Sequence, residues 1–175
     1  MKKYVFILSL VFVVLLSGCK SSDNKTQKVQ METENIMTFT MTSESVYSGK
    51  EVTVLVKTKN NPGFLTMAVK VEYDTKAMVL TNINNGEDFR DYNFIPPKNL
   101  QSGCKISWFI TDLPDKTVDG ELLKLYFHVY DDTIVGDYPI TVSPINDGGI
   151  VDGNKELITV IESNDVIKVQ NKEDR

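Results

Sequence analysis

The chain of 175 residues is poor in several residue types on which catalysis depends. It has one histidine, one tryptophan and two cysteines. The single histidine, His128, provides little material for a catalytic triad, and its setting favours an interface role over that of a general base or metal ligand. The chain also lacks a basic cluster in its folded part, and its 19 basic and 24 acidic residues give a net charge of −5. Nucleic-acid binding and a basic membrane-surface helix are therefore disfavoured.

One of the two cysteines follows an apolar run at the N-terminus. Lys2 and Lys3 precede the run YVFILSLVFVVLL, which has the length of a signal-peptide core and is too short, with these flanks, for a spanning helix. The run leads into LSGC, residues 16–19, which resembles the lipobox of bacterial lipoprotein precursors. The resemblance implies that residues 1–18 are removed and that the thiol of Cys19 receives diacylglycerol. We therefore expect a lipid-anchored protein of the bacterial cell membrane, exposed outside the cytoplasm.

The second cysteine, Cys104, has no partner for an intrachain disulfide once Cys19 carries a lipid. We expect Cys104 to be a small, buried or half-buried apolar residue. Residues 19–35 are polar and show no helical stripe, so they are predicted to be a flexible spacer. The folded domain is expected over residues 36–170, followed by a polar tail at residues 171–175.

From residue 36 onward, short runs rich in β-branched residues alternate with turn sequences such as NNPG at 60–63 and VGD at 135–137. A long apolar period of 3.6 residues is lacking, which argues against helices. The pattern predicts an all-β sandwich of nine strands. These strands are expected at residues 36–42, 51–58, 64–73, 78–83, 104–111, 121–130, 138–142, 157–161 and 166–169.

The predicted strands at 64–73, 104–111 and 121–130 alternate between two faces. One face is apolar and would cover the core, with Leu65, Met67, Val69, Val71, Tyr73, Ile106, Trp108, Ile110, Leu123, Leu125, Phe127 and Val129. The other face would point outward, with Thr66, Ala68, Lys70, Glu72, Lys105, Ser107, Phe109, Leu122, Lys124, Tyr126 and His128. Aromatic side chains among lysines are typical of a protein interface, although isolated apolar residues are also common on ordinary surfaces.

Residues 46–169 resemble the cohesin modules of cellulosome scaffoldins in the order and spacing of several segments. These are the YD that closes the third strand, GELLKLYFHV at 120–129, GDYPITV at 136–142 and a short final hairpin. The resemblance implies a nine-stranded jelly-roll whose third, fifth, sixth and eighth strands form a flat sheet. That sheet would bind a dockerin, a small calcium-loaded module carried by enzymes. The outward residues named above would then form one partner-binding surface.

The connection at residues 84–103 departs from the usual cohesin pattern, because it is long and carries three aromatic residues. It leaves the class of partner open. A carbohydrate-binding module is the main alternative, with Phe89, Tyr92 and Phe94 as stacking residues, together with Trp108 if the faces are inverted. A purely structural adhesin domain at the cell surface is a further alternative.

The sequence provides little support for catalysis or for a resident cofactor. Its acidic residues gather at turns, where Asp is favoured for backbone reasons, so we expect no enzyme activity. The segment NDGGIVDGN, residues 146–154, lacks the alternating acidic residues and closing Glu of an EF-hand loop. We interpret it as a glycine-rich loop. Any calcium in a complex is expected to belong to the dockerin.

Overall fold

The computed structural model describes residues 35–112, 117–145, 150–162 and 164–171. Over these residues the chain forms eleven strands and a short 3₁₀ helix, η1 (Glu87–Phe89). The all-β prediction is therefore confirmed, whereas the predicted number of strands is wrong. The strands are β1 (Ile36–Ser43), β2 (Val46–Tyr47), β3 (Glu51–Lys59), β4 (Thr66–Tyr73), β5 (Met78–Asn85), β6 (Asn93–Ile95), β7 (Cys104–Phe109), β8 (Gly120–Val129), β9 (Gly136–Pro144), β10 (Thr159–Ile161) and β11 (Asn164–Gln170).

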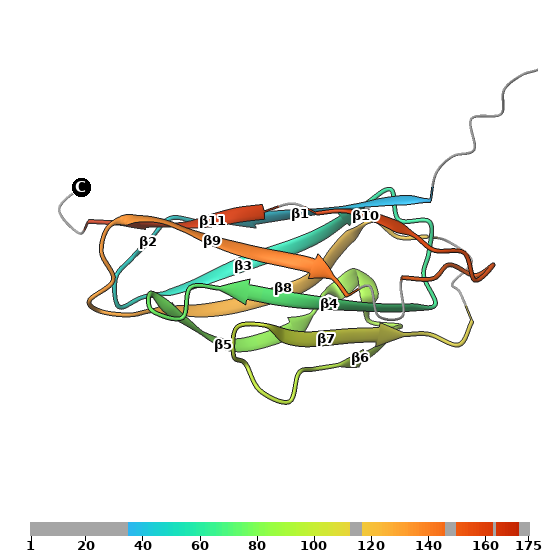
Figure 1. The fold of residues 1–175 in the computed structure, drawn as a ribbon, viewed down its shortest axis with the longest axis horizontal. Helices are drawn as coiled ribbons and strands as arrows, with labels where there is room; N and C mark the ends of the chain where they lie inside the picture. Colours follow the sequence, from blue (N-terminus) through green and yellow to red (C-terminus); the bar gives the residue numbers. More distant parts are fainter. Residues whose placement is uncertain (1–34, 113–116, 146–149, 163, 172–175) are drawn as a thin grey trace, which may run out of the picture. The chain divides into compact units, whose positions relative to one another are not determined.

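The strands form two sheets that enclose the core (Figure 1). Sheet A has the order β10-β1-β3-β8-β5, and sheet B has the order β2-β11-β9-β4-β7-β6. Antiparallel pairing dominates, but β10 runs parallel to β1 and β2 runs parallel to β11. Phe39 and Val54 of sheet A and Val69 and Ile106 of sheet B are fully buried between the layers. Each sheet therefore has one inner and one outer face.

Two of the predicted alternating strands keep their alternation in the structure. In β4, Met67, Val69 and Val71 are buried, while the residues between them are exposed or half-exposed. In β7, Ile106 and Trp108 are buried in the same way. The inner faces predicted within these two strands are confirmed, because a period of two puts every second side chain into the core. Leu65 and Ile110, also predicted to be inward, lie just outside the strands and are half-buried.

Strict alternation fails at the start of β8. Val56 of β3 pairs with Leu123, but the next residue of β3, Lys57, pairs with Glu121. Leu122 is thus the extra residue of a β-bulge. Both Leu122 and Leu123 are fully buried. The prediction that Leu122 belongs to the outer surface is wrong, because the bulge turns two successive side chains toward the core.

The connection at 84–103 is packed into the domain and adds a strand to sheet B. Phe89 and Tyr92 are buried, and their rings lie 5.8 Å and 4.5 Å from the ring of Phe64. β6 then pairs with β7 at the edge of sheet B. Neither β6 nor β2 was predicted, because two or three residues are too few to show a period. These two strands account for the difference between nine and eleven.

The predictions for the N-terminus and the tail fall largely outside the described residues. They concern the signal peptide, Cys19, the spacer up to residue 35, and the polar tail at 171–175. Over the stretches of chain that the structure does describe, no helix is long and apolar enough to cross a membrane.

Candidate docking surface

The structure divides the predicted partner-binding residues between two sheets. β4 and β7 are neighbours in sheet B, whereas β8 lies in sheet A. Lys124, Tyr126 and His128 therefore point away from the core on the opposite side from Lys70 and Phe109. The prediction of a single surface is wrong. Alternation along a strand shows which side chains share a face of that strand, but hydrogen bonding between strands decides which strands share a sheet.

The unpredicted strand β6 explains the error. The binding sheet was expected from the third, fifth, sixth and eighth strands, counted without β6. If the strands are numbered again with β6 included and with the short β2 and β10 left out, the third, fifth, sixth and eighth strands are β4, β6, β7 and β9. These four strands are direct neighbours in sheet B, in the order β9-β4-β7-β6. Of the four strands predicted for the binding sheet, β4 and β7 lie in sheet B, whereas β8 and β10 lie in sheet A, so the prediction is wrong for two of its four strands.

We call the outer side of β9, β4, β7 and β6 the docking face. Its rows follow from the strand register: Asn93, Phe109 and Thr66 form one row, and Ile95, Ser107 and Ala68 form the next. Lys105, Lys70 and Ser143 form a third row. The docking face consists of Asn93, Ile95, Lys105, Ser107, Phe109, Thr66, Ala68, Lys70, Glu72, Thr141 and Ser143.

Two large apolar side chains stand out on the docking face. Ile95 is 50% exposed and Phe109 is 42% exposed. Ser107 and Ala68 continue the row of Ile95 with small side chains. The large side chains of Ile95 and Phe109 therefore stand next to small residues. An exposed aromatic and an exposed aliphatic side chain beside small polar residues can act as the anchors of a protein interface.

The charges of the docking face are mainly those of two neighbouring lysines. Lys70 lies directly across from Lys105. The Nζ atom of Lys70 is 2.9 Å from the Oε2 atom of Glu72, which offsets the repulsion between the two ammonium groups. Lys105 has no ion pair with another described residue. It is thus free to meet a carboxylate of a partner.

A part-buried polar contact between the sheets lies beneath the docking face. The indole N–H of Trp108 in β7 donates a hydrogen bond of 2.7 Å to Oδ1 of Asn85, at the end of β5. The amide nitrogen of Asn85 donates a hydrogen bond of 2.9 Å to the carbonyl of Phe89. The ring of Phe94 in β6 packs against the indole, with 5.6 Å between the ring centroids. These contacts on the inner side of sheet B therefore fix the positions of β6 and β7.

Buried aromatic rings rule out the carbohydrate platform considered from sequence. Phe89, Tyr92 and Trp108 are all buried in the core, and Phe94 is half-buried against Trp108. A sugar ring needs an accessible aromatic face, which these side chains do not offer. They stabilise the fold instead.

The three predicted residues of β8 form part of a separate outer face. Lys124 lies 3.0 Å from Oε1 of Glu121, and this hydrogen bond raises the pKa of Lys124 above its ordinary value. Nδ1 of His128 lies 3.2 Å from Oε1 of Glu51 on β3. The hydroxyl of Tyr126 accepts a hydrogen bond of 3.3 Å from the amide of Asn84 on β5.

Cys104 is buried and unpaired, as predicted. Burial raises the pKa of its thiol above the ordinary value. The thiol therefore stays protonated at neutral pH and is a poor nucleophile. Cys104 is a structural residue at the start of β7.

The loop considered for calcium is organised by one buried carboxylate. Asp152 accepts hydrogen bonds of 2.8 Å from the backbone N–H groups of Asn154 and Glu156, and one of 3.0 Å from the amide of Asn35. Residues 146–149 of this loop lie outside the described part. Within the described part, no three His, Cys, Asp or Glu side chains are grouped as a metal site would require. Asp152 thus holds the loop against the start of β1.

A family comparison agrees with this geometry. Residues 37–169 match the model of the cohesin domain. The chain belongs to the cohesin family. Cohesins are non-catalytic modules for protein–protein interaction, so the expectation that the chain is not an enzyme is confirmed. No curated protein matches this cohesin.

Solved cohesins have the same fold. CaCohA2 of Clostridium acetobutylicum, in a complex with a variant of CaDoc0917, is 25% identical with a TM-score of 0.60, over 77% of this chain and 99% of that one. The third cohesin of ScaC from Acetivibrio cellulolyticus, in complex with the ScaB dockerin, is 21% identical with a TM-score of 0.63, over 77% and 99%. A non-cellulosomal cohesin of Archaeoglobus fulgidus is 14% identical with a TM-score of 0.54, over 78% and 94%.

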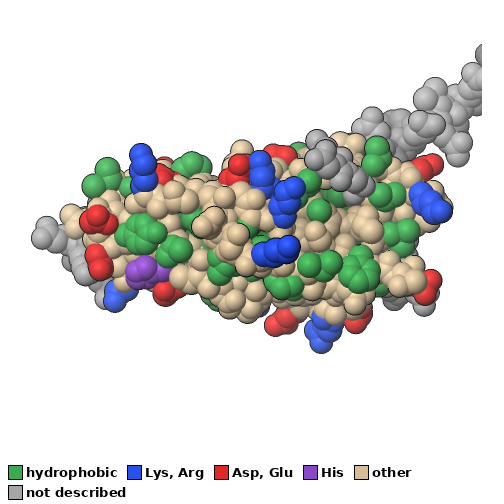
Figure 2. Space-filling view, turned by 60° about the horizontal axis from the view of Figure 1, so that its bottom comes forward, with side chains coloured by type: hydrophobic (Ala, Val, Ile, Leu, Met, Phe, Trp, Pro, Cys, Tyr) green, Lys and Arg blue, Asp and Glu red, His purple; other side chains and the backbone are tan. Residues whose placement is uncertain are grey.

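Apolar and charged side chains are mixed on the surface of the molecule. Figure 2 shows hydrophobic side chains interspersed with basic and acidic ones over one side of the molecule. Residues of the docking face that sequence reasoning missed are Asn93 and Ile95 of β6 and Thr141 and Ser143 of β9. β9 was predicted as a strand but not assigned to this sheet. The only sequence signal for β6 is a pair of apolar residues followed by two prolines, at residues 94–97.

Proposed function

We propose that this cohesin binds a dockerin through its docking face. The observation that carries the proposal is the exposure of Ile95 and Phe109 on a continuous four-stranded face. Solved structures of the same fold include complexes with dockerins and with a CaDoc0917 variant, which supports the same class of partner here. A standard interface of about 800 Å² per partner would cover most of this face.

The proposed complex forms by rigid docking. Ile95 and Phe109 enter apolar pockets of the dockerin and exclude water, which provides most of the binding energy. Lys105 and Lys70 attract carboxylates of the partner, which orients the encounter and raises the association rate at low salt. β6, where Ile95 lies, is held beneath by Phe94 and Trp108, so little conformational entropy is lost on binding.

The first test compares two apolar residues of the docking face with an aromatic residue on the outer face of sheet A. Phe109→Ala and Ile95→Ala are each expected to weaken dockerin binding by more than about 1 kcal/mol, or roughly fivefold in Kd. Tyr126→Ala is the matched control, because it removes an outward aromatic ring from sheet A. Titration calorimetry with purified dockerins encoded by the same genome, with and without calcium, would measure the affinities. Loss of binding in the Tyr126 variant with full affinity in the other two would place the interface on sheet A.

We also propose that the mature protein is anchored by a lipid on Cys19 at the outer side of a bacterial cell membrane. The LSGC motif after the apolar run supports this proposal. The buried CH₂ groups of the acyl chains would each contribute about 0.8 kcal/mol of membrane affinity. The spacer would hold the docking face away from the bilayer. Such a protein would display dockerin-bearing enzymes at the cell surface, in the manner of a cellulosome component that degrades polysaccharide.

Metabolic labelling tests the anchor. Cells grown with an alkyne analogue of palmitate are expected to label the wild-type chain and the Cys104→Ala variant, because Cys104 is buried and lies outside the motif in the sequence. The Cys19→Ala variant should carry no label and should leave the detergent phase on phase separation. A labelled Cys19→Ala variant would contradict lipidation at this cysteine.

A further inference from the structure

A cavity lies at the edge of sheet A, away from the docking face. β1 pairs with β3 as far as Ser43, opposite Val54. The chain then crosses to sheet B, where β2 pairs with β11. Among the described strands none covers residues 51–53 of β3 on this side, although β8 pairs with them on the other. The strand edge is left open as a result.

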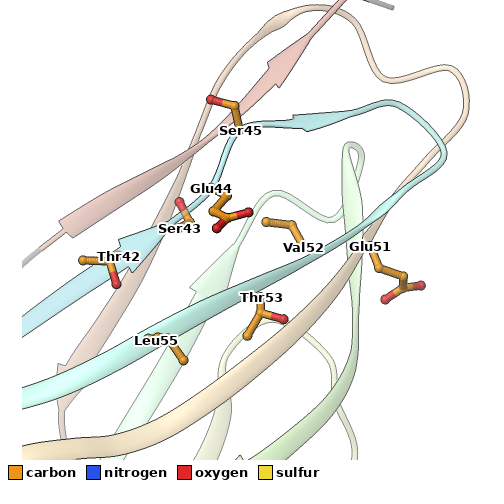
Figure 3. A pocket seen from close by; sticks show the side chains of 8 residues that line it. All are labelled: Thr42, Ser43, Glu44, Ser45, Glu51, Val52, Thr53 and Leu55. Atoms are coloured by element: carbon orange, nitrogen blue, oxygen red, sulfur yellow. The ribbon is translucent and has the colours of Figure 1, made fainter.

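The cavity at this open edge has a volume of about 590 Å³. It lies between the end of β1, the loop that follows it and the start of β3 (Figure 3). Figure 3 shows Glu44 extending from the loop toward Val52 of β3. The volume falls within the range of about 300–1,000 Å³ that is usual for small-ligand sites. The lining residues are Thr42, Ser43, Glu44, Ser45, Glu51, Val52, Thr53 and Leu55.

The lining is rich in hydroxyl groups and carries no cationic side chain. The hydroxyl of Ser43 is already bonded to Oδ2 of Asp165 and to the carbonyl of Val166, at 3.1 Å and 3.2 Å. The other hydroxyl side chains, Thr42, Ser45 and Thr53, have no such bond to another described residue. They can both donate and accept. Glu44 and Glu51 add acceptors and would repel an anionic ligand.

An aromatic ring stands beside this polar lining. Thr53 pairs directly with Tyr126 of β8, and Glu51 pairs with His128. Side chains at such positions lie on the same face with Cβ atoms about 5 Å apart. Tyr126 is half-exposed, and its hydroxyl is held by Asn84. Glu51 is likewise held in place by His128 at 3.2 Å. Tyr126 and Glu51 are thus both held on the outer face of sheet A, on or next to the strand that borders the cavity, and the Tyr126 hydroxyl is directed toward β5.

We propose that this cavity and Tyr126 together form a binding site for a neutral polysaccharide. A sugar ring has an apolar face, which stacks on the Tyr126 ring, and a rim of hydroxyl groups. The hydroxyls exchange hydrogen bonds with Thr53, Thr42 and the carboxylates of Glu44 and Glu51. The carboxylates of Glu44 and Glu51 select against acidic glycans, and Lys124, which lies opposite the lining residue Leu55, is paired with Glu121. The site differs from the buried aromatic platform considered from sequence in both location and residues.

The polysaccharide site is independent of the docking face, because the two lie on the outer sides of opposite sheets. The cohesin can therefore hold a glycan and a protein partner at the same time. The proposal stands whether or not the partner on the docking face is a dockerin.

Affinity electrophoresis of the full chain tests the proposal. The chain is run in a polyoxyethylene detergent, which has no sugar headgroup to compete, through native gels that contain hydroxyethylcellulose, xyloglucan, galactomannan, arabinoxylan or β-glucan. At least one polysaccharide should retard the wild-type chain relative to a gel without polysaccharide. Tyr126→Ala should reduce the affinity at least about tenfold, whereas Phe109→Ala should leave it unchanged.

Two further measurements distinguish loss of binding from loss of folding. Thermal unfolding followed by circular dichroism should show a nearly unchanged Tm for Tyr126→Ala, and Tyr126→Phe, which keeps the ring, should retain binding. Absence of retardation in all five gels, or equal retardation of wild type and Tyr126→Ala, would overturn the proposal. Binding of an oligolysine peptide that is lost in Glu51→Gln but kept in Tyr126→Ala would also overturn it, in favour of a cationic ligand.

Discussion

Replacing Trp108 with alanine is expected to lower the free energy of unfolding by about 3–5 kcal/mol, the usual cost of removing a large buried aromatic ring. The side chain is 1% exposed. Its ring supports Phe94 of β6, and its N–H bonds to Asn85 across the two sheets. The alanine variant would leave a cavity and an amide oxygen without its donor. Native domains are stable by only about 5–15 kcal/mol, so much of the total would be lost.

Urea unfolding followed by far-ultraviolet circular dichroism measures this effect, because the variant lacks the only tryptophan and its fluorescence. Trp108→Phe is the matched control. It keeps most of the ring but removes the N–H donor, so a smaller loss of about 1–2 kcal/mol is expected. A loss below about 1 kcal/mol for the alanine variant would show that the ring is not part of the core.

Gly86→Ala is expected to destabilise the domain by about 3 kcal/mol or more, although it adds only a methyl group. The backbone of Gly86 has φ −69° and ψ 151°, which any residue adopts. The alanine variant is destabilised by a steric clash rather than by backbone strain. A Cβ atom at this position would overlap the carbonyl oxygen of Glu121, which is backbone and cannot rotate away. The N–H of Gly86 also donates a hydrogen bond of 2.9 Å to the carbonyl of Leu122.

The same unfolding experiment compares this variant with Gly136→Ala. A Cβ atom at Gly136 would meet only Cε2 of Tyr138, at 3.8 Å, which is an ordinary contact. That variant is expected to stay within about 0.5 kcal/mol of the wild type. Similar stabilities for the two variants would contradict the close packing of Gly86 against the β8 bulge.

The Gly86 contact also bears on the outer face of sheet A. Gly86 lies against the bulge residues Glu121 and Leu122, and the bulge sets which later residues of β8 point outward. Lys124, Tyr126 and His128 share the outer face because of that offset. A variant that shifts the bulge is therefore expected to disturb the proposed polysaccharide site before the docking face.

The sequence alone was sufficient for the class of fold and for the inner faces of β4 and β7. β-branched runs with a period of two and frequent turn residues predict strands, because a sheet with one buried face imposes that period on its side chains. The order of the segments also indicated the cohesin family, which the family comparison confirms. The burial of Cys104 followed from its residue type and its lack of a partner.

Only the tertiary structure decided which strands share a sheet. Phe109 and Tyr126 look equivalent in the sequence, since both alternate with buried neighbours, yet they lie on opposite outer faces. Sheet membership depends on backbone hydrogen bonds between distant segments, and local patterns carry little information about such pairing. The burial of Leu122 and the existence of β6 were hidden for related reasons. A bulge and a three-residue strand are stabilised by their neighbours in space rather than by a periodicity of their own.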